Sequence, residues 1–388
     1  MNTLYFDHAA TTPCDPRVRD TLMNALTHTN ANPHSTTYKA GHAAAKIVEQ
    51  ARTDVAVLIS ADPREIIFTS GATESNNLAI KGAVRHLVHM GSTRRRVITI
   101  TTEHKCVLQS VLDLKAEGFE PVILPVDPDG RLAPETLTRA LETPTALVSI
   151  AAANHETGVL QDLNLLGTLI KESGALFHSD LAQAAGKMPV NVHDLKLSLA
   201  SLSSHKLYGP KGVGALFIRR TPRVRIQPLF SGGGQERGLR SGTLPGFLLA
   251  GFGQACHIAQ QEHQRDFQHL TQLQSIFLHT LDSKLPGCSV NAASTPRLPG
   301  IINLRLPEGI KALDVIALLP TLEISLGSAC SSALLEPSYV LCAIGLSVSE
   351  AERSLRLSPG RFTTKTEAEN AADELAHAAL QARIINKG

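Results

Sequence analysis

The 388-residue chain contains no tryptophan, and aromatic residues make up only 4% of it. It lacks an apolar run near the ~18 residues that a membrane-spanning helix requires, so no membrane segment is expected. The first residues show neither the basic start nor the apolar core of a secretion signal, which favours a cytoplasmic location. Neither sign of charge dominates, because 37 Lys and Arg face 35 Asp and Glu. Direct binding of nucleic acid through a basic face is therefore not expected.

Paired cysteines are missing as well. The six cysteines are scattered, and none forms the Cys-x-x-Cys pair that is typical of zinc or thioredoxin-like sites. A chain of this length needs no disulfide staples, so free thiols in a reducing compartment are expected. The six are Cys14, Cys106, Cys256, Cys288, Cys330 and Cys342.

The first two thirds of the chain instead alternate short apolar runs with amphipathic stretches. Strands are predicted at 65–69, 96–100, 121–124, 145–150, 175–178, 197–201 and 214–218. Helices are predicted from residue 73 and over 105–115, 134–141 and 163–172. This alternation predicts an α/β fold whose mostly parallel sheet is covered by helices on both faces.

A long helical pattern over 245–285 leads into a second region. There the sequence predicts strands at 301–304 and 355–357 and helices over 312–319 and 365–385. We therefore expect a large domain of residues 16–255 and a smaller α/β domain of residues 256–388, on which residues 1–15 pack.

Several predicted strands are followed directly by polar side chains, and open α/β sheets bind ligands beyond the carboxyl ends of their strands. Residues 70–76, Ser-Gly-Ala-Thr-Glu-Ser-Asn, open a helix whose first N–H groups favour an anion. The same residues would also fit an ordinary N-cap that has only a structural role. His104 opens another helix, and a single histidine there is usually structural.

Two further strand ends carry charged residues. Asp180 ends a buried strand, with Gln183 after it, and a buried carboxylate needs a cationic or hydrogen-bonding partner. Lys206 lies between a strand and a Gly/Pro turn, where a buried lysine can bond covalently to a carbonyl, whereas Lys211 is expected to be exposed. Taken together, the four strand ends supply what is needed to hold pyridoxal phosphate.

Cys330 differs from the other cysteines because its neighbours Gly327, Ser328 and Ala329 are too small to bury it. We expect an exposed thiol in a flexible loop, with an ordinary pKa of about 8.5 that a nearby base or cation can lower. Such a thiol can act as a nucleophile.

At this point the chain resembles, nearly end to end, the cysteine desulfurases of the NifS/IscS type within the class V aminotransferase-like enzymes. The resemblance implies fold type I of the pyridoxal-phosphate-dependent transferases, and the branch with a longer loop around its cysteine. It is carried by segments 7–13, 68–75, 102–105, 203–206, 208–212, 236–243 and 327–330.

The resemblance also implies a role for each matching residue. Lys206 would hold the cofactor covalently, and His104 would stack on its ring and move protons. Asp180 would pair with the ring nitrogen, and Gln183 would approach the phenolic oxygen. The remaining expected site residues are Ala72, Thr73, Ser203 and His205 for the phosphate, Thr243 for the phosphate of a partner subunit, Asn154 and Arg356 for the substrate, and Cys330 for the attack on sulfur.

The sequence departs from the family pattern at three positions. His155 stands where the family usually has a second Asn beside the cofactor, which predicts an added pH dependence. Cys14 and Cys106 lie near site motifs where small apolar residues are more usual, and both are interpreted as packing thiols.

The resemblance implies a homodimer that takes sulfur from L-cysteine and passes it to an iron–sulfur scaffold protein, or toward tRNA thiolation. Two alternatives remain open at this point. One is another enzyme on the same scaffold, a selenocysteine lyase or a small-amino-acid transaminase. The other is a non-catalytic sulfur-relay protein. A transaminase needs no thiol such as Cys330, and a relay needs no Lys206, His104 and Asp180 together.

Overall fold

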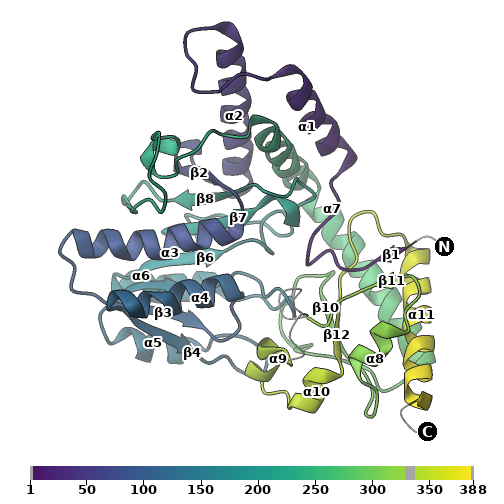
Figure 1. Cartoon of the computed structure of the whole chain (residues 1–388). Helices are drawn as coiled ribbons and strands as arrows, with labels where there is room; N and C mark the ends of the chain where they lie inside the picture. Colours follow the sequence, from purple (N-terminus) through teal and green to yellow (C-terminus); the bar gives the residue numbers. More distant parts are fainter. Residues whose placement is uncertain (1–2, 328–336, 386–388) are drawn as a thin grey trace.

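A computed structural model describes residues 3–327 and 337–385 of the chain. Its largest element is a seven-stranded sheet in the order β2-β8-β7-β6-β5-β3-β4 (Figure 1). Neighbours from β7 to β4 are parallel, whereas β8 is antiparallel to both β2 and β7. The prediction of a mostly parallel α/β sheet is confirmed.

The strands of this sheet are β2 (Ile66–Thr69), β3 (Arg96–Ile100), β4 (Glu120–Leu124), β5 (Thr145–Ser149), β6 (Leu176–Asp180), β7 (Leu199–Ser203) and β8 (Gly214–Ile218). The helices that precede or join them are α1 (Pro16–His28), α2 (Lys39–Leu58), α3 (Ala72–His89), α4 (Lys105–Asp113), α5 (Pro134–Leu141) and α6 (Leu163–Ser173).

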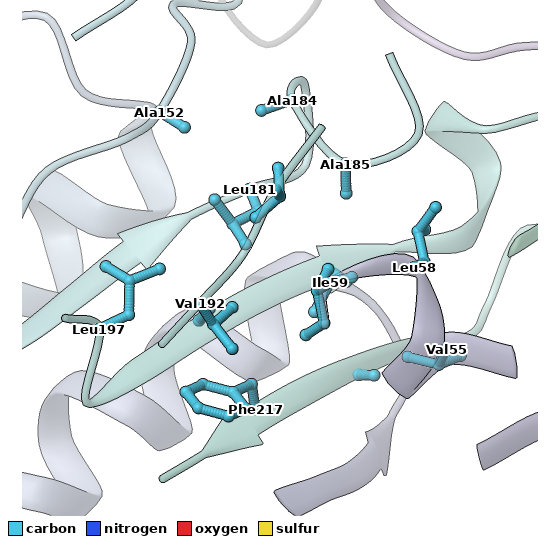
Figure 2. Close-up of a cluster of buried hydrophobic side chains, with 14 of the residues drawn as sticks. Val55, Leu58, Ile59, Ala152, Leu181, Ala184, Ala185, Val192, Leu197 and Phe217 are labelled. Carbon is cyan, nitrogen blue, oxygen red and sulfur yellow. The ribbon is translucent and has the colours of Figure 1, made fainter. Parts of the chain in front are cut away.

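Both faces of the sheet are buried, which explains why its strands read as continuous apolar runs. Successive residues of a strand point to opposite faces. Leu216 therefore lies in a cluster with residues of α3 and α4, while Phe217 lies in another with residues of α2. Figure 2 shows part of the cluster around Phe217, where Val55 and Ile59, at the end of α2, lie near that ring. Because both faces are buried, polar side chains are largely confined to the ends of the strands.

Most of the remaining elements surround a further apolar cluster, here called the C-terminal cluster. Beside it lies a small sheet of order β12-β10-β9, whose strands β10 and β12 are labelled in Figure 1. A short parallel pair, β1 with β11, brings the N-terminal segment here, and Phe6 is buried in the cluster. The elements are β1 (Leu4–Tyr5), β9 (Ser289–Val290), β10 (Ile302–Arg305), β11 (Leu322–Glu323), β12 (Ser354–Leu357), α8 (Ala312–Ala317), α9 (Tyr339–Ala343), α10 (Val348–Glu352) and α11 (Lys365–Ile385).

Helix α7 (Gly246–Lys284) runs from one cluster to the other. Phe252 belongs to the cluster around Phe217, and Phe277 belongs to the cluster that contains Phe6. The predicted domain boundary between residues 255 and 256 falls inside this helix, so the division into two domains remains a prediction. Within residues 3–327 and 337–385, no helix is both long and apolar enough to cross a lipid bilayer.

Candidate active site

A cavity of about 490 Å³ is lined by residues that follow the strands of the large sheet. It collects most of the site residues predicted from the sequence. These are Ala72, Thr73, His104, Asn154, His155, Asp180, Gln183, Ser203, His205, Lys206 and Arg356. Thr243 is exposed and is not part of this lining, and Cys330 lies outside the described residues.

Asp180 is the last residue of β6 and is buried at the floor of the cavity. Its Oδ2 accepts a hydrogen bond from Asn76 Nδ2 at 2.7 Å, and its Oδ1 accepts one from the Ala182 N–H at 2.8 Å. Both donors are neutral, and no side chain in the described part of the chain forms an ion pair with it. A buried carboxylate with neutral partners favours a cationic group beside it, such as a protonated ring nitrogen.

Lys206 reaches the cavity from the 3-10 turn Ser204–Lys206 that follows β7. Its Nζ donates to the carbonyl oxygens of Ala9 at 2.6 Å and Ala10 at 2.7 Å. The Thr12 N–H in turn donates to the carbonyl of His205 at 2.9 Å. The N-terminal segment therefore fixes the direction of the lysine side chain, an arrangement suited to covalent attachment of a ligand in the cavity.

The start of α3 forms an anion cradle at one end of the cavity. Gly71 precedes the helix with a φ of 150°, a conformation that favours glycine. The first-turn N–H groups, which include those of Ala72 and Thr73, have no partner within the helix. Ser203 and His205 line the same cavity. Burial and then the charge of Lys206 lower the pKa of His205 to about 4, so it is neutral at pH 7. The cradle fits a phosphate group.

His104 is the N-cap of α4, and its Nδ1 accepts the backbone N–H of Cys106 at 3.2 Å. Its ring lies edge-on to that of His155, with centroids 5.1 Å apart. Burial first, and then the charge of His155, lower the pKa of His104 to about 4. Because a neutral Nδ1 that accepts cannot also carry the proton, the proton of the neutral ring lies on Nε2. The neutral ring is suited to stacking on an aromatic ligand, and its Nε2–H is a hydrogen-bond donor.

Cys106 has a second role that the sequence did not reveal. Its side chain packs against the apolar cluster under α3, as a packing thiol should. The sulfur also lines the cavity, 3.0 Å from Nδ1 of His104 and 3.1 Å from Nδ2 of Asn76. Burial raises the pKa of this thiol to about 12, so it stays protonated. Its place two residues after a helix-capping histidine was the available signal, because an N-cap side chain contacts that position.

Arg356, in β12, is buried although it carries a charge. Its Nη1 donates to the His155 carbonyl at 2.9 Å, and its Nη2 donates to Asp7 Oδ1 at 2.7 Å. Its Nε has no hydrogen-bond partner among the described residues. Nη1 and Nη2 each keep a second N–H, and a guanidinium on a cavity wall with free donors is suited to a carboxylate ligand. Asp7 was not among the site residues that the sequence predicted.

Two amide side chains near the cavity differ in how much freedom they keep. Asn154 uses both ends, since Oδ1 accepts the N–H groups of Glu156 and Thr157 and Nδ2 donates to the Thr102 carbonyl. It shapes its own loop, and its contact with substrate stays a prediction. Gln183 donates from Nε2 to the Ala9 carbonyl at 2.9 Å, which leaves its second N–H for the cavity.

Comparison with known proteins gives consistent matches. The aminotransferase class-V family model matches residues 4–370. Cysteine desulfurase IscS of Rickettsia akari is 46% identical, over 95% of this chain and 89% of that protein. Cysteine desulfurase of Mus musculus is also 46% identical, over 97% of this chain and 81% of that protein. Among solved structures, a NifS-like protein superimposes with a TM-score of 0.88 at 33% identity, over 97% of this chain and 98% of that chain. SspA in complex with cysteine superimposes with a TM-score of 0.81 at 34% identity, over 93% of this chain and 99% of that chain.

Proposed function

The chain belongs to the aminotransferase class-V family and is a cysteine desulfurase of the NifS/IscS type, and from this premise we propose how its cavity works. The cofactor is pyridoxal 5'-phosphate. The reaction converts L-cysteine and one enzyme thiol into L-alanine and an enzyme persulfide. The observation that carries the proposal is the convergence of Lys206, Asp180, His104 and the cradle of α3 on one cavity.

The residues present fit this cofactor. Lys206 would hold it covalently, Asp180 would face its ring nitrogen, and the start of α3 with Ser203 and His205 would take its phosphate. His104 would stack against the ring. When bound, the group supplies an electron-withdrawing ring that stabilises negative charge on the substrate carbon next to it.

The chain's own groups then divide the remaining tasks. Arg356 binds the substrate carboxylate through the terminal N–H groups that its bonds to the His155 carbonyl and to Asp7 leave free, which fixes the orientation of the amino acid. Lys206 Nζ and the neutral ring of His104 hold and move protons beside the substrate. The sulfur of Cys330 attacks the substrate sulfur, so the new S–S bond forms while the C–S bond breaks. The carbon keeps that electron pair and takes a proton, which leaves alanine.

The persulfide on Cys330 is then available to a sulfur acceptor. We propose an iron–sulfur scaffold protein or a tRNA-thiolation protein as that acceptor. We also propose a homodimer, in which the exposed Thr243 reaches the phosphate site of the partner subunit. The free cysteines among the described residues suit a reducing compartment, and a cytoplasmic location is proposed on that ground.

The test uses the purified full chain loaded with pyridoxal phosphate. With L-cysteine and a reductant, sulfide and alanine should form in equal amounts, and borohydride should attach the cofactor to the peptide that contains Lys206. The Lys206→Ala variant should do neither. Formation of a keto acid instead would indicate a transaminase, preferential turnover of selenocysteine would indicate a lyase, and a protein that takes up no cofactor would indicate a sulfur relay.

A further inference from the structure

The thiol of Cys106 belongs to a small polar cluster in the wall of the cavity. Its Sγ is 3.0 Å from Nδ1 of His104 and 3.1 Å from Nδ2 of Asn76. The hydroxyl of Thr73 also bonds to this sulfur and lowers the pKa of the thiol, so it is a donor rather than an acceptor. Burial outweighs these bonds and raises the pKa to about 12, which leaves one S–H at neutral pH. The neighbours of the sulfur determine where that S–H points.

The amide of Asn76 has one possible orientation. Its Nδ2 lies 2.7 Å from Oδ2 of Asp180, and a carboxylate oxygen accepts hydrogen bonds, so the NH₂ end must face Asp180. The second N–H of the same nitrogen then donates to the sulfur of Cys106. Oδ1 of Asn76 is left buried and without a partner among the described residues, so the amide is held by its two acceptors alone. The sulfur thus accepts from Asn76, and its own proton points away from that amide.

Nδ1 of His104 is the acceptor that remains for the thiol proton. The backbone N–H of Cys106 donates to this nitrogen at 3.2 Å, so Nδ1 carries its lone pair and no proton. A protonated thiol 3.0 Å from such a nitrogen donates to it. Two donors of one residue therefore face Nδ1 and oppose a proton there. The proton of the neutral ring lies on Nε2, which forms no hydrogen bond within residues 3–327 and 337–385.

The charged groups around His104 do not select between its two nitrogens. Burial is the main cause of its low pKa of about 4, and the charges of His155, Lys206 and Lys105 lower that value while Asp180 acts to raise it. These charges act over a distance on the ring as a whole. A hydrogen bond to one nitrogen acts on that nitrogen alone, so the contact with the thiol fixes what the charges leave open.

We propose that Cys106 is a positioning residue for His104: its S–H holds Nδ1 as an acceptor, which keeps the ring neutral and leaves Nε2–H for the bound ligand. A cationic ring there would oppose the protonated ring nitrogen that Asp180 is suited to hold. Asn76 joins both groups, because its amide bonds to Asp180 and to the sulfur of Cys106. This inference rests on the proposed function, because it concerns the ring that would stack on the cofactor.

The test observes the histidine ring itself, in full-length protein loaded with pyridoxal phosphate and labelled with a nitrogen isotope in its histidines. Long-range proton–nitrogen NMR spectra distinguish a proton on Nε2, a proton on Nδ1 and the cationic ring, and His104→Gln assigns the signal. At pH 7 the unaltered protein should show a neutral ring with its proton on Nε2. In Cys106→Ala, loss of one donor should raise the titration midpoint of His104 by about 0.5–1 pH unit. Cys106→Ser keeps an O–H donor and should keep the original midpoint.

Cys256→Ala is the matched control, because Cys256 is a buried thiol of α7 outside the cavity lining, and it should leave the His104 signal unchanged. Equal midpoints in folded Cys106→Ala and the unaltered protein would overturn the role of Cys106. If that variant does not fold, the unaltered protein decides, since a neutral ring with its proton on Nδ1 would also overturn the inference. Protein that takes up no pyridoxal phosphate would instead overturn the proposed function, and the same spectra would still report which nitrogen of His104 carries the proton.

Discussion

Arg356 donates from Nη2 to Oδ1 of Asp7 at 2.7 Å, although the two residues are 349 positions apart in the chain. The ion pair joins the N-terminal segment to β12 at the wall of the cavity, and Arg356 is the more deeply buried partner. Nη1 is held by the His155 carbonyl, so the guanidinium is anchored at two of its nitrogens. Its orientation toward the cavity therefore depends on Asp7.

Replacing Asp7 by Asn should weaken this anchor without removing volume. A hydrogen bond between charged partners contributes about 1.5–3 kcal/mol. Losing about half of that energy would weaken substrate binding by up to about tenfold. We therefore expect KM for L-cysteine to rise about tenfold in Asp7→Asn, with a smaller change in kcat. Steady-state alanine production measures both. Asp20→Asn, on the exposed face of α1, should leave both constants unchanged. An unaltered KM in Asp7→Asn would contradict the anchoring role.

Replacing Cys330 by Ser should separate cofactor binding from chemistry. A hydroxyl is a poor nucleophile toward sulfur, so Cys330→Ser should keep the absorbance of the bound cofactor but form no alanine from cysteine. Cys342→Ser is the control, since Cys342 is an exposed cysteine of α9 and should be dispensable. Alanine release at the parent rate by Cys330→Ser would show that another group is the nucleophile.

Replacing His155 by Asn should change the titration of its neighbour. Burial is the main cause of the low pKa of His104, and the charge of His155 lowers it further. Asn carries no charge, so the pKa of His104 should rise from about 4 in the variant. Ring-proton NMR, with His104→Gln to assign the signal, measures the shift. The pH profile of activity should change as well, and identical profiles in the two proteins would refute a role for His155 in pH dependence.

The buried charges around Arg361 should matter for stability rather than catalysis. Arg361 donates to Asp15 at 2.9 Å and to Asp266 at 2.8 Å, and it lies over the ring of Tyr208. Arg361→Met would leave the carboxylate of Asp266 without its close ion pair and Asp15 with Arg17 as its remaining partner, a loss of about 3 kcal/mol in the free energy of unfolding. Urea denaturation followed by circular dichroism measures it. Arg19→Met, which removes an exposed pair, should cost less than about 1 kcal/mol.

The same network gives the stability a defined dependence on pH. Burial acts to raise the pKa of Asp15, but hydrogen bonds from Arg17 and Arg361 lower it to about 2. A folded-state pKa below the unfolded value of about 3.9 stabilises the fold above that value. The contribution should therefore disappear as the pH falls from about 4 to about 2, and the loss should be smaller in Arg361→Met. Equal acid sensitivity of the two proteins would contradict this assignment.

The sequence predicted much of the large sheet because both of its faces are buried. The predicted strand at 214–218 coincides with β8, and the predicted helices at 134–141 and 365–385 coincide with α5 and α11. Strand order and direction were not predictable in the same way, since the antiparallel placement of β8 between β2 and β7 depends on contacts distant in the chain. Helices α1 and α2 precede the first predicted strand and were not predicted.

The cavity was predicted at strand ends and missed wherever distant segments meet. Asp180 and Lys206 could be found because each follows an apolar run. Asp7 could not be placed beside Arg356, because only the pairing of the N-terminal segment with the second region brings them together. The only signal for Cys106 was its place two residues after a helix-capping histidine, and its contact with the cavity follows from side-chain packing around His104.

The continuity of α7 has a consequence for how the chain could be divided. The helix has 39 residues, or about 58 Å of unbroken backbone, and its two halves are buried in different clusters. A chain cut at residue 255 would strip one core of the residues that cover it and leave the other with an unsupported helix end. Fragments made at that point should aggregate, whereas amide protons along α7 in the intact chain should exchange slowly on both sides of it.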